Sequence, residues 1–391
     1  MSGTGDGPGD VLLTGATGFL GMELLARYLE RTDRTVLALV RAPDLDRARA
    51  RIDTVLELLF GRADIHPSRV VAIPADIEQD GLGLTDSLRE LVAARTSEIV
   101  HCAATVSFVS ELKDARRINV DGTSNLLRLA TECANRGTLR RFVHVSTAYV
   151  AGTHDGEFGE HDLDVGQRFR NPYERTKYEA EQRVREHAAE LPAVTIVRPS
   201  IIVGESTTGW TPSFNVLYVP LRAFALRRLR LLPADPSAPV DVVPVDHVAD
   251  AIMHLTETSD RGLSTYHLVA AERAATVEQL VELSARQLGL RPPPLVSPRL
   301  YRAARPALVA CAGGRRRAAL ERVAPFLPYY TMRVRYRRDR AGQRLDPAGL
   351  EPPPLRSYYH RLVQYAVATN WNRRPQPRPR AAAPSVASTR P

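Results

Sequence analysis

The chain has 391 residues, of which 44% are hydrophobic and 25% are charged, and its formal net charge is +9. These proportions are typical of a folded globular protein and exclude a disordered chain, and the lack of any run of about 18 apolar residues excludes a transmembrane helix. The cysteines Cys102, Cys133 and Cys311 are scattered, which excludes a disulfide framework and indicates a reducing compartment, for which we expect the cytoplasm.

Both ends of the chain are expected to lack fixed structure. Residues 1–9 alternate glycine with polar residues and predict a flexible lead, and residues 372–391 are rich in proline and arginine and predict a disordered tail. A further arginine-rich segment, residues 301–345, has Glu321 and Asp339 as its only acids. Such charge suits phosphate-bearing ligands, nucleic acid or peripheral contact with an anionic membrane, or is simply solvated. Charge is the only feature of the sequence that favours a nucleic-acid partner, so we expect none.

Strands and helices alternate through the first half of the chain. Short apolar runs between turn residues predict strands, and amphipathic runs predict helices. The predicted strands are residues 11–13, 35–40, 69–73, 98–102, 141–145 and 193–198. The predicted helices are residues 22–29, 45–60, 85–95, 112–135 and 173–189. This order predicts an α/β fold with a doubly wound parallel sheet of the Rossmann type, built from right-handed βαβ units.

The alternation ends after residue 203 and predicts a second, smaller part. Residues 204–239 contain aromatic residues and prolines without a clear strand, whereas residues 240–258 return to a strand followed by a helix. We therefore predict a dinucleotide-binding domain of residues 10–203 joined by 240–258, and a substrate-binding lobe made of residues 204–239 and 259–371. Further predicted elements are a strand at residues 265–269 and helices at residues 276–288 and 355–368.

A glycine-rich turn follows the first predicted strand. Gly15, Gly18 and Gly21 have the spacing G-x-x-G-x-x-G between a strand and a helix. Glycine lets the backbone bend and approach a ligand closely, and the free N–H groups at a helix start favour an anion such as a pyrophosphate. We therefore expect this run to bind a dinucleotide cofactor. The expected contact residues are Thr14, Gly15, Thr17, Gly18, Phe19, Leu20 and Gly21.

The ends of the next three strands indicate which dinucleotide binds. The second strand is followed by Arg41 and not by an acid, and a guanidinium there suits a 2′-phosphate, which predicts NADPH rather than NADH. Asp76 and Ile77 follow the third strand, where a carboxylate can bind the adenine amino group. Ala103 ends the fourth strand with a small side chain, which leaves room for a cofactor across the sheet edge.

Hydroxyl groups, a tyrosine and a lysine follow the fifth strand in an order that suits catalysis. Ser146 and Thr147 end that strand, and Tyr173 and Lys177 lie four positions apart on one helix face. A tyrosine with its ordinary pKa of about 10 is a poor acid–base catalyst, so it needs a neighbouring cation, which Lys177 is placed to supply. A hydroxyl at the strand end would hold the substrate oxygen.

These motifs resemble those of a known family. The run from Thr14 to Gly21, together with Tyr173-x-x-x-Lys177, resembles the extended short-chain dehydrogenase/reductase family. Four further segments resemble its thioester reductase and fatty acyl-CoA reductase branch, which is male-sterility-like. They are residues 142–150, 171–174, 198–204 and 241–246. The resemblance covers roughly residues 10–260, and it adds Pro199 to the expected cofactor contacts.

The resemblance implies a role for each residue and a reaction. Thr147 takes the place of the catalytic hydroxyl, with Ser146 as second choice, Tyr173 is the acid, and Lys177 is its partner and holds the nicotinamide ribose. Arg41 takes the place of the 2′-phosphate contact. The implied reaction is the NADPH-dependent reduction of an acyl thioester to an aldehyde, with a second round giving the alcohol. The acyl group would come activated, on CoA or on a separate acyl carrier protein.

Other functions use the same residues and stay open. An NADP-dependent hydroxysteroid dehydrogenase or a sugar-nucleotide epimerase/dehydratase of the same family would need the same set. A non-catalytic NADP-sensing protein on this fold would have no need to keep Thr147, Tyr173 and Lys177 together.

Three segments have a second interpretation. Residues 210–232 interleave aromatic residues and leucines with arginines, which fits either an acyl channel whose arginines meet a phosphopantetheine or CoA phosphate, or a lid helix with a basic outer face. Alternating arginines in residues 329–337 predict a strand with one basic face, which needs no ligand. Acids and histidines in residues 154–162 predict a polar loop, and we expect no metal there.

Overall fold

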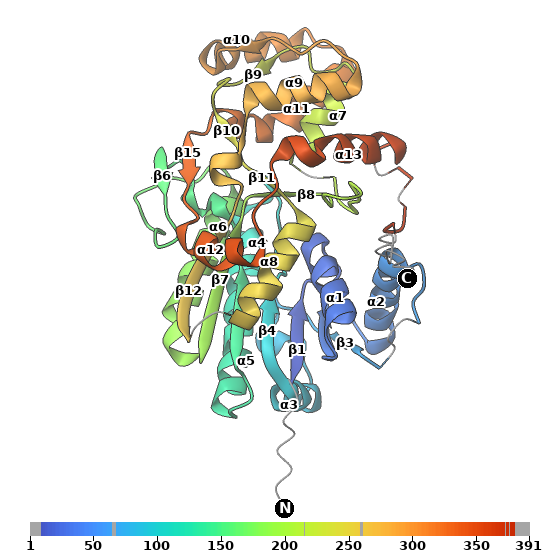
Figure 1. Cartoon of the computed structure of the whole chain (residues 1–391), viewed down its shortest axis with the longest axis vertical. Helices are drawn as coiled ribbons and strands as arrows, with labels where there is room; N and C mark the ends of the chain where they lie inside the picture. The colour runs from blue at the N-terminus through green and yellow to red at the C-terminus, as the bar shows by residue number, and fades with distance from the viewer. Residues whose placement is uncertain are drawn as a thin grey trace, which may run out of the picture.

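A seven-stranded parallel sheet is the centre of the computed structural model (Figure 1). The structure describes residues 9–64, 68–214, 216–258, 261–371, 373–374 and 376–379, without the side chains of residues 315, 316 and 319. The strand order is β12-β7-β5-β4-β1-β2-β3, which confirms the predicted doubly wound sheet and places its topological switch between β1 and β4. The strands are β1 (Asp10–Thr14), β2 (Val36–Val40), β3 (Val70–Pro74), β4 (Thr96–His101), β5 (Arg141–Val145), β7 (Ala193–Pro199) and β12 (Gly262–Leu268).

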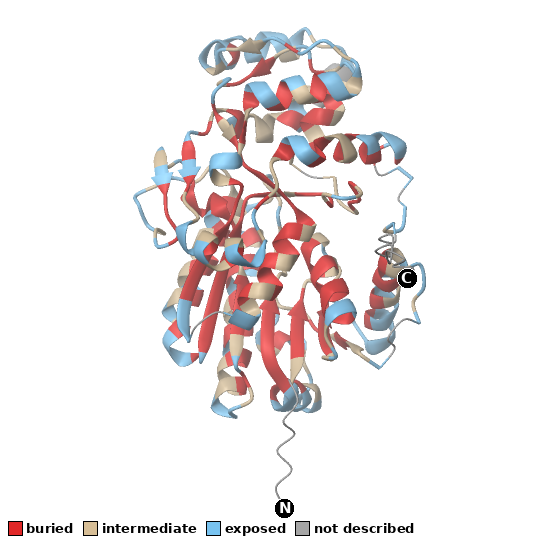
Figure 2. Cartoon of the chain, viewed as in Figure 1, coloured by how far each residue is buried: buried red, intermediate tan, exposed pale blue. Residues whose placement is uncertain are grey.

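Helices cover both faces of this sheet, and Figure 2 shows the strands buried between them. In β1, Val11 and Leu13 pack with one group of helices and Leu12 packs with the other, because successive strand residues point to opposite faces. A sheet covered on both faces needs strands that are apolar throughout, which explains the continuous apolar runs of the sequence. The first group is α1 (Phe19–Arg31), α2 (Leu45–Phe60) and α8 (Val245–Thr258). The second group is α3 (Asp86–Arg95), α5 (Gly122–Asn135) and α6 (Pro172–Glu186).

The helix predicted over residues 112–135 is interrupted. It consists of α4 (Leu112–Arg116), a π-helical turn η2 (Arg117–Asp121) and then α5. The π-helical turn contains Asn119, whose side-chain amide bonds the backbone of Thr105 in the loop after β4. A π turn inserts one extra residue into a helix and changes where its side chains point, which a simple helical periodicity does not reveal.

The sheet domain takes more of the chain than we predicted. Residues 262–268, which we assigned to the lobe, form β12 and pair in parallel with β7 along their whole length. The helix α12 (Asp339–Leu345) then packs against β12 and α8. The predicted boundary at residue 259 was therefore wrong, because the partner that makes this segment an edge strand lies some seventy residues earlier in the chain.

The remaining lobe lies beyond the carboxyl ends of the strands (Figure 1). Its core is rich in buried tyrosines, among them Tyr218, Tyr330, Tyr358 and Tyr359. Its helices are α7 (Tyr218–Ala225), α9 (Val277–Leu288), α10 (Pro298–Ala310), α11 (Gly314–Val323), η6 (Ala324–Thr331) and α13 (Leu355–Ala368). Within the described residues, no helix has the length and apolarity needed to cross a membrane.

Four short strand pairs lie outside the main sheet among the described residues. They are β6 (Gly156–Phe158) with β15 (Val334–Tyr336), β8 (Ile201–Val203) with β11 (Val242–Pro244), β9 (Leu232–Pro233) with β14 (Leu295–Val296), and β10 (Pro239–Val240) with β13 (Ala275–Thr276). The strand predicted at residues 329–337 is confirmed only for β15, where Val334 and Tyr336 are buried and Arg335 is exposed. The residues before it are helical and belong to η6.

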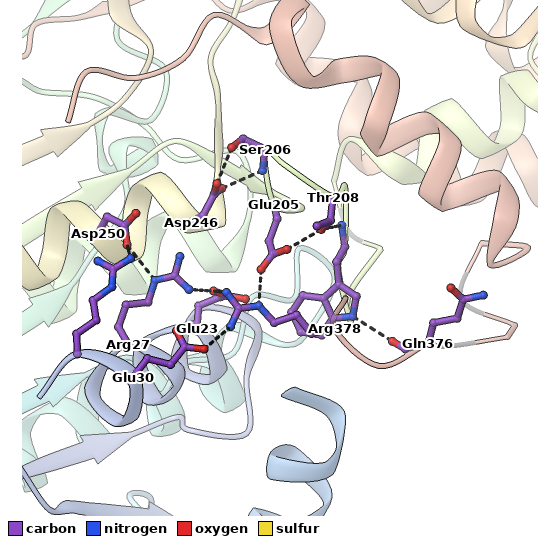
Figure 3. A network of polar contacts seen from close by, with 12 residues as sticks. Glu23, Arg27, Glu30, Glu205, Ser206, Thr208, Asp246, Asp250, Gln376 and Arg378 are labelled. Atoms are coloured by element: carbon purple, nitrogen blue, oxygen red, sulfur yellow. Dashed lines mark hydrogen bonds and ion pairs between the residues drawn. The ribbon is translucent and has the colours of Figure 1, made fainter. Parts of the chain in front are cut away.

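Part of the segment that we expected to be a disordered tail packs against the sheet domain. The backbone carbonyl of Gln376 accepts a hydrogen bond of 3.0 Å from the indole of Trp210. Figure 3 shows Arg378 among three carboxylates, with Nε 2.5 Å from Glu205 Oε1, Nη2 3.3 Å from Glu23 Oε2 and Nη1 3.4 Å from Glu30 Oε1. Composition did not predict this contact, because the partners of Arg378 come from distant segments.

The carboxylate of Glu23 is a buried group of this ionic network whose charge is costly to accommodate. Glu23 lies in α1 with a fully buried side chain, and its other ion-pair partner is Arg27, one turn along the same helix. Burial raises the pKa of Glu23 to about 7, while Arg27 and Arg378 lower it. Since its pKa in the unfolded chain is near 4.5, ionisation of Glu23 costs folding free energy as the pH rises from about 4.5 through about 7.

Substitution Arg378→Gln should therefore destabilise the fold in a pH-dependent way. We expect the free energy of unfolding to fall by about 2–3 kcal/mol at pH 8, where Glu23 is charged, and by clearly less at pH 5.5, where it is protonated. Urea unfolding at the two pH values measures the difference. Arg374→Gln, an exposed arginine of the same segment, is the control and should change neither value. Equal losses at both pH values would contradict the role given to Glu23.

Candidate active site

A cavity of about 730 Å³ lies at the carboxyl edge of the sheet. Its walls come from the turn after β1, the loop after β4, the ends of β5 and β7, the start of α6 and residues 321–326 of the lobe. Ligands of doubly wound sheets bind at this edge beside the topological switch, so the cavity is the candidate active site. We call it the cleft.

The glycine turn is packed so tightly that side chains are excluded from it. Gly15 has a φ of +75°, and a Cβ on Gly15 would lie 2.8 Å from the backbone nitrogen of Ala103. A Cβ on Gly21 would lie 2.0 Å from the carbonyl oxygen of Gly15. Gly18 N–H closes the turn with a hydrogen bond of 2.8 Å to the same carbonyl, and α1 begins at the next residue. The free N–H groups of the helix start thus meet the cleft and fit the pyrophosphate of a dinucleotide.

The predicted cofactor residues of the turn fall into two groups. Gly15, Gly18, Phe19, Leu20 and Gly21 line the cleft. Thr14 does not line it, and its hydroxyl oxygen instead accepts hydrogen bonds of 3.2 Å from the backbone nitrogens of residues 102 and 103. Thr14 therefore ties β1 to the end of β4, a role that the motif alone did not indicate.

The predicted residues around the adenosine end lie outside the lining of the cleft. Arg41 is exposed, and its guanidinium is 3.1 Å from Glu78. Arg51 Nη2 donates a hydrogen bond of 3.3 Å to the hydroxyl of Thr17, which brings a second guanidinium to the end of β2. Three further predicted residues, also outside the lining, follow β3 and β4. They are Asp76, Ile77 and Ala103.

Ile77 and Asp76 shape the backbone after β3. The side chain of Ile77 packs against Gly122 of α5, and its carbonyl accepts a hydrogen bond of 2.7 Å from Asn125. The carboxylate of Asp76 accepts a hydrogen bond of 3.0 Å from the backbone nitrogen of Glu78. This bond uses one oxygen of the Asp76 carboxylate.

The structure brings the three predicted catalytic residues together at the bottom of the cleft. Thr147 follows β5 and lines the cleft together with Tyr173, and its hydroxyl donates a hydrogen bond of 3.4 Å to the carbonyl of Pro199. Tyr173 lies in the first turn of α6, which Asn171 caps by accepting a hydrogen bond of 3.0 Å from the backbone nitrogen of Glu174. Lys177, one turn further, donates a hydrogen bond of 2.7 Å to the carbonyl of Val145.

The pKa shifts of Tyr173 and Lys177 differ from what we expected from the sequence. Burial raises the pKa of Tyr173 to about 12, and the hydrogen bond from Thr147 only partly opposes this. Burial also lowers the pKa of Lys177 to about 8. We expected Lys177 to favour the phenolate, but one N–H of its ammonium bonds the Val145 carbonyl, and Lys177 is not among the groups that shift the pKa of Tyr173. Tyr173 is therefore a phenol in this cleft and suits the role of proton donor.

The hydroxyl of Ser146 bonds a buried carboxylate, and that of its neighbour Thr147 bonds a backbone carbonyl. Its hydroxyl donates a hydrogen bond of 2.7 Å to Glu181. Glu181 is fully buried and forms an ion pair of 2.7 Å with Arg198, also fully buried. Both Ser146 and Thr147 line the cleft, and the ranking of Thr147 before Ser146 stays a prediction.

Several residues that hold the catalytic helix were missing from the sequence predictions. Asn119 donates a hydrogen bond of 2.9 Å to the hydroxyl of Thr176 in α6. Phe108 stacks on the ring of Tyr173 at 5.8 Å and on that of Tyr329 at 5.3 Å. Phe108 thus joins the loop after β4 to the lobe. In the sequence, Asn119 was marked only as the first residue of the run 119–123, which resembles the helix after the fourth strand in the extended short-chain dehydrogenase/reductase family.

Tyr329 also bonds the start of the catalytic helix directly. Its hydroxyl donates a hydrogen bond of 2.5 Å to Glu174 and accepts one of 2.7 Å from Asn171. Glu174 is fully buried, so this contact satisfies a carboxylate that water does not reach. The lobe therefore holds the catalytic helix through a polar contact as well as covering the cleft.

The acidic loop at residues 154–162 has a structural role. Glu160 accepts hydrogen bonds from the backbone nitrogens of His267, Arg340 and Ala341, at 2.9, 2.6 and 3.0 Å. These bonds join the loop to β12 and α12. Across the part of the chain that the structure describes, no three histidine, cysteine or acidic side chains are grouped as metal ligands would be.

Comparison with known proteins gives one matching family and several relatives. The model of the family described as male sterility protein matches residues 13–252. Isonitrile lipopeptide synthase of Streptomyces coeruleorubidus is 39% identical over 263 residues, which cover 64% of this chain and 17% of that protein. Fatty acyl-CoA reductase 1 of Mus musculus is 34% identical over 280 residues, which cover 62% of this chain and 53% of that protein. The chain thus matches about half or less of each relative's length.

A solved structure agrees over nearly the whole chain. The terminal R domain from the myxalamid PKS-NRPS biosynthetic pathway superposes with a TM-score of 0.81 at 26% identity, covering 95% of this chain and 94% of that one. The similarity therefore extends through the lobe, beyond the residues that the family model matches.

Substitution Gly21→Ala should abolish binding of the nicotinamide cofactor. The added methyl group would meet the Gly15 carbonyl, so the turn must open and α1 must shift away from the cleft. We expect the dissociation constant, measured by cofactor fluorescence, to rise at least about tenfold. Gly313→Ala is the control, since a Cβ there has open space around it. Unchanged binding in Gly21→Ala would show that the turn does not hold the cofactor.

Proposed function

Since the chain belongs to the male sterility protein family of nicotinamide-dependent reductases, we propose that it reduces acyl thioesters to aldehydes with NADPH. The observation that carries this proposal is the half-buried phenol of Tyr173, which lines one cleft together with Thr147, Lys177 and the glycine turn. Among the relatives, fatty acyl-CoA reductase 1 is named for a thioester substrate, which supports the same substrate class here.

The mechanism uses the hydroxyls of Thr147 and Tyr173 as donors to the thioester carbonyl. The glycine turn and Lys177 would hold NADPH, which would supply the hydride that reduces the carbonyl carbon. The two hydroxyls stabilise the negative charge that develops on the carbonyl oxygen, and Tyr173 transfers its proton to that oxygen. The resulting hemithioacetal then releases the thiol and leaves the aldehyde. Lys177 would hold the nicotinamide ribose, and a second round would give the alcohol.

The surroundings of the cleft support an acyl substrate. Val106, Val109, Ile201, Val216 and Phe326 present apolar side chains to it. A second cavity of about 410 Å³, lined mainly by aromatic and aliphatic residues, shares Ile201, Val216 and Phe326 with the cleft. We propose that the acyl group occupies this second cavity.

The preference for NADPH rests on the end of β2. Arg41 follows this strand, and Arg51 of α2 reaches the same place through its hydrogen bonds to Thr17 and to the carbonyl of Arg41. Two guanidiniums can form charge-assisted hydrogen bonds with a 2′-phosphate, which NADH lacks. Arg41 would exchange its exposed ion pair with Glu78 for this phosphate.

A turnover assay tests the proposal, with Tyr173→Phe as the decisive variant. NADPH oxidation is followed by absorbance with acyl-CoAs, fatty aldehydes, ketones and, in the reverse direction, secondary alcohols, and free thiol is titrated. We expect acyl-CoA turnover with thiol release, and a loss of roughly 10²–10⁴-fold in Tyr173→Phe with unchanged NADPH binding.

The control for this assay is Tyr178→Phe, which removes a hydroxyl from the same helix outside the cleft. Near-normal rates in Tyr173→Phe would contradict its role as the acid. Turnover of ketones or secondary alcohols alone would make the protein a dehydrogenase of the hydroxysteroid type. Binding of NADPH without any turnover would favour the sensor function.

Substitution of Arg41 and Arg51 by alanine tests the cofactor preference. Removing both guanidiniums should raise the KM for NADPH by at least about tenfold and leave the KM for NADH within about twofold, because only NADPH carries the phosphate. The control is Arg47→Ala, an exposed arginine of α2. An equal change for both cofactors would contradict the assignment.

A further inference from the structure

Four arginines from separate segments lie together beside the cleft. Arg222 belongs to α7, Arg228 follows that helix, Arg322 belongs to α11, and Arg373 follows α13. Arg222, Arg228 and Arg322 line a small hollow of about 70 Å³, together with the rings of Phe214, Tyr218 and Trp371. Burial lowers the pKa of Arg222, and the positive charges of Arg373, Arg322 and Arg228 lower it further, so all four lie within electrostatic range.

The positive charge of this cluster is not neutralised by the protein. Over the described residues, none of the four guanidiniums forms an ion pair or a side-chain hydrogen bond. The acid next to the cluster in sequence, Glu321, is paired with Arg317 at 3.0 Å. Like charges held together without a counterion cost free energy, which a bound anion would offset.

The hollow adjoins the active site. Val219 of α7 and Arg322 of α11 line both the hollow and the cleft. The two helices pack against each other, so the arginines are placed by the folded lobe and not by a free loop. The hollow lies on the lobe side of the cleft, whereas the glycine turn and Arg41 belong to the sheet domain. A cofactor phosphate at the helix start of α1 is thus a different anion from the one that this cluster would bind.

We propose that Arg222, Arg228, Arg322 and Arg373 bind a phosphate group of the thiol that carries the acyl chain. This inference rests on the proposed thioester reduction. CoA and the phosphopantetheine arm of a carrier protein both attach a phosphate to the pantetheine that ends in the thiol. The planar guanidinium matches a phosphate with two parallel hydrogen bonds, and several such groups around a small hollow suit its compact charge. The cluster therefore selects the carrier of the acyl group rather than the acyl group.

The test compares one acyl group on four thiols, with the wild-type chain and the double variant Arg222→Gln/Arg228→Gln. The thiols are N-acetylcysteamine and pantetheine, which lack phosphate, and 4′-phosphopantetheine and CoA, which carry it. We expect the variant to lose at least about tenfold in kcat/KM for the two phosphate-bearing thioesters and less than about twofold for the other two. Arg230→Gln, an exposed arginine of the same segment that does not line the hollow, is the control and should show no selective loss.

The outcomes separate the inference from the function on which it rests. An equal loss for phosphopantetheine and CoA thioesters supports recognition of the phosphate that both share, and a larger loss for CoA supports recognition of its nucleotide phosphates. Equal loss for all four thioesters, no loss, or a raised KM for NADPH alone overturns the inference while the proposed function stands. If the wild-type chain reduces none of the four thioesters but binds NADPH, the proposed function itself has failed.

Discussion

The close contact between Gly15 and Gly21 is the constraint on which the active site depends. The start of α1 lies over the Gly15 carbonyl at a distance that admits no side chain, and Thr14 fixes the preceding strand to the end of β4. This contact places the free N–H groups of the helix at the sheet edge, beside the residues that follow β4, β5 and β7. Tyr173 and Thr147 become catalytic candidates because they meet at that same edge.

The lobe completes the site rather than only covering it. Phe108 lies between the rings of Tyr173 and Tyr329, and Tyr329 bonds the buried carboxylate of Glu174 in the catalytic helix. Displacing the lobe would leave that carboxylate without its hydroxyl partner, which is costly for a group away from water. The orientation of Tyr173 is therefore coupled to the docking of the lobe, although the two lie more than 150 residues apart in the chain.

The protein uses arginine in two ways that composition does not distinguish. Arg198 and Arg378 neutralise buried carboxylates and join distant segments, with Glu181 and Glu23 as partners. Such pairs are costly to break, because removing one member leaves the other charge buried. The arginines around the hollow of the lobe lie at the edge of the substrate cleft without a protein counterion among the described residues. Arginines of the second kind can bind an anion without first breaking a buried ion pair.

By itself the sequence determined the Rossmann sheet, the family and the place of the glycine turn. These depend on local patterns, because strand burial follows from apolar runs and the turn needs glycine at Gly15 and Gly21. The same local spacing put Tyr173 and Lys177 on one helix face, although their catalytic roles remain predictions.

Tertiary structure decided what depends on distant partners. It placed residues 262–268 in the sheet through pairing with β7, engaged Ser146 with Glu181, and ordered Arg378 beside Glu23. It also left Lys177 bonded to a backbone carbonyl and the pKa of Tyr173 raised by burial. The physical reason is that burial and pairing belong to the packed chain, in which groups far apart in sequence exclude water from one another.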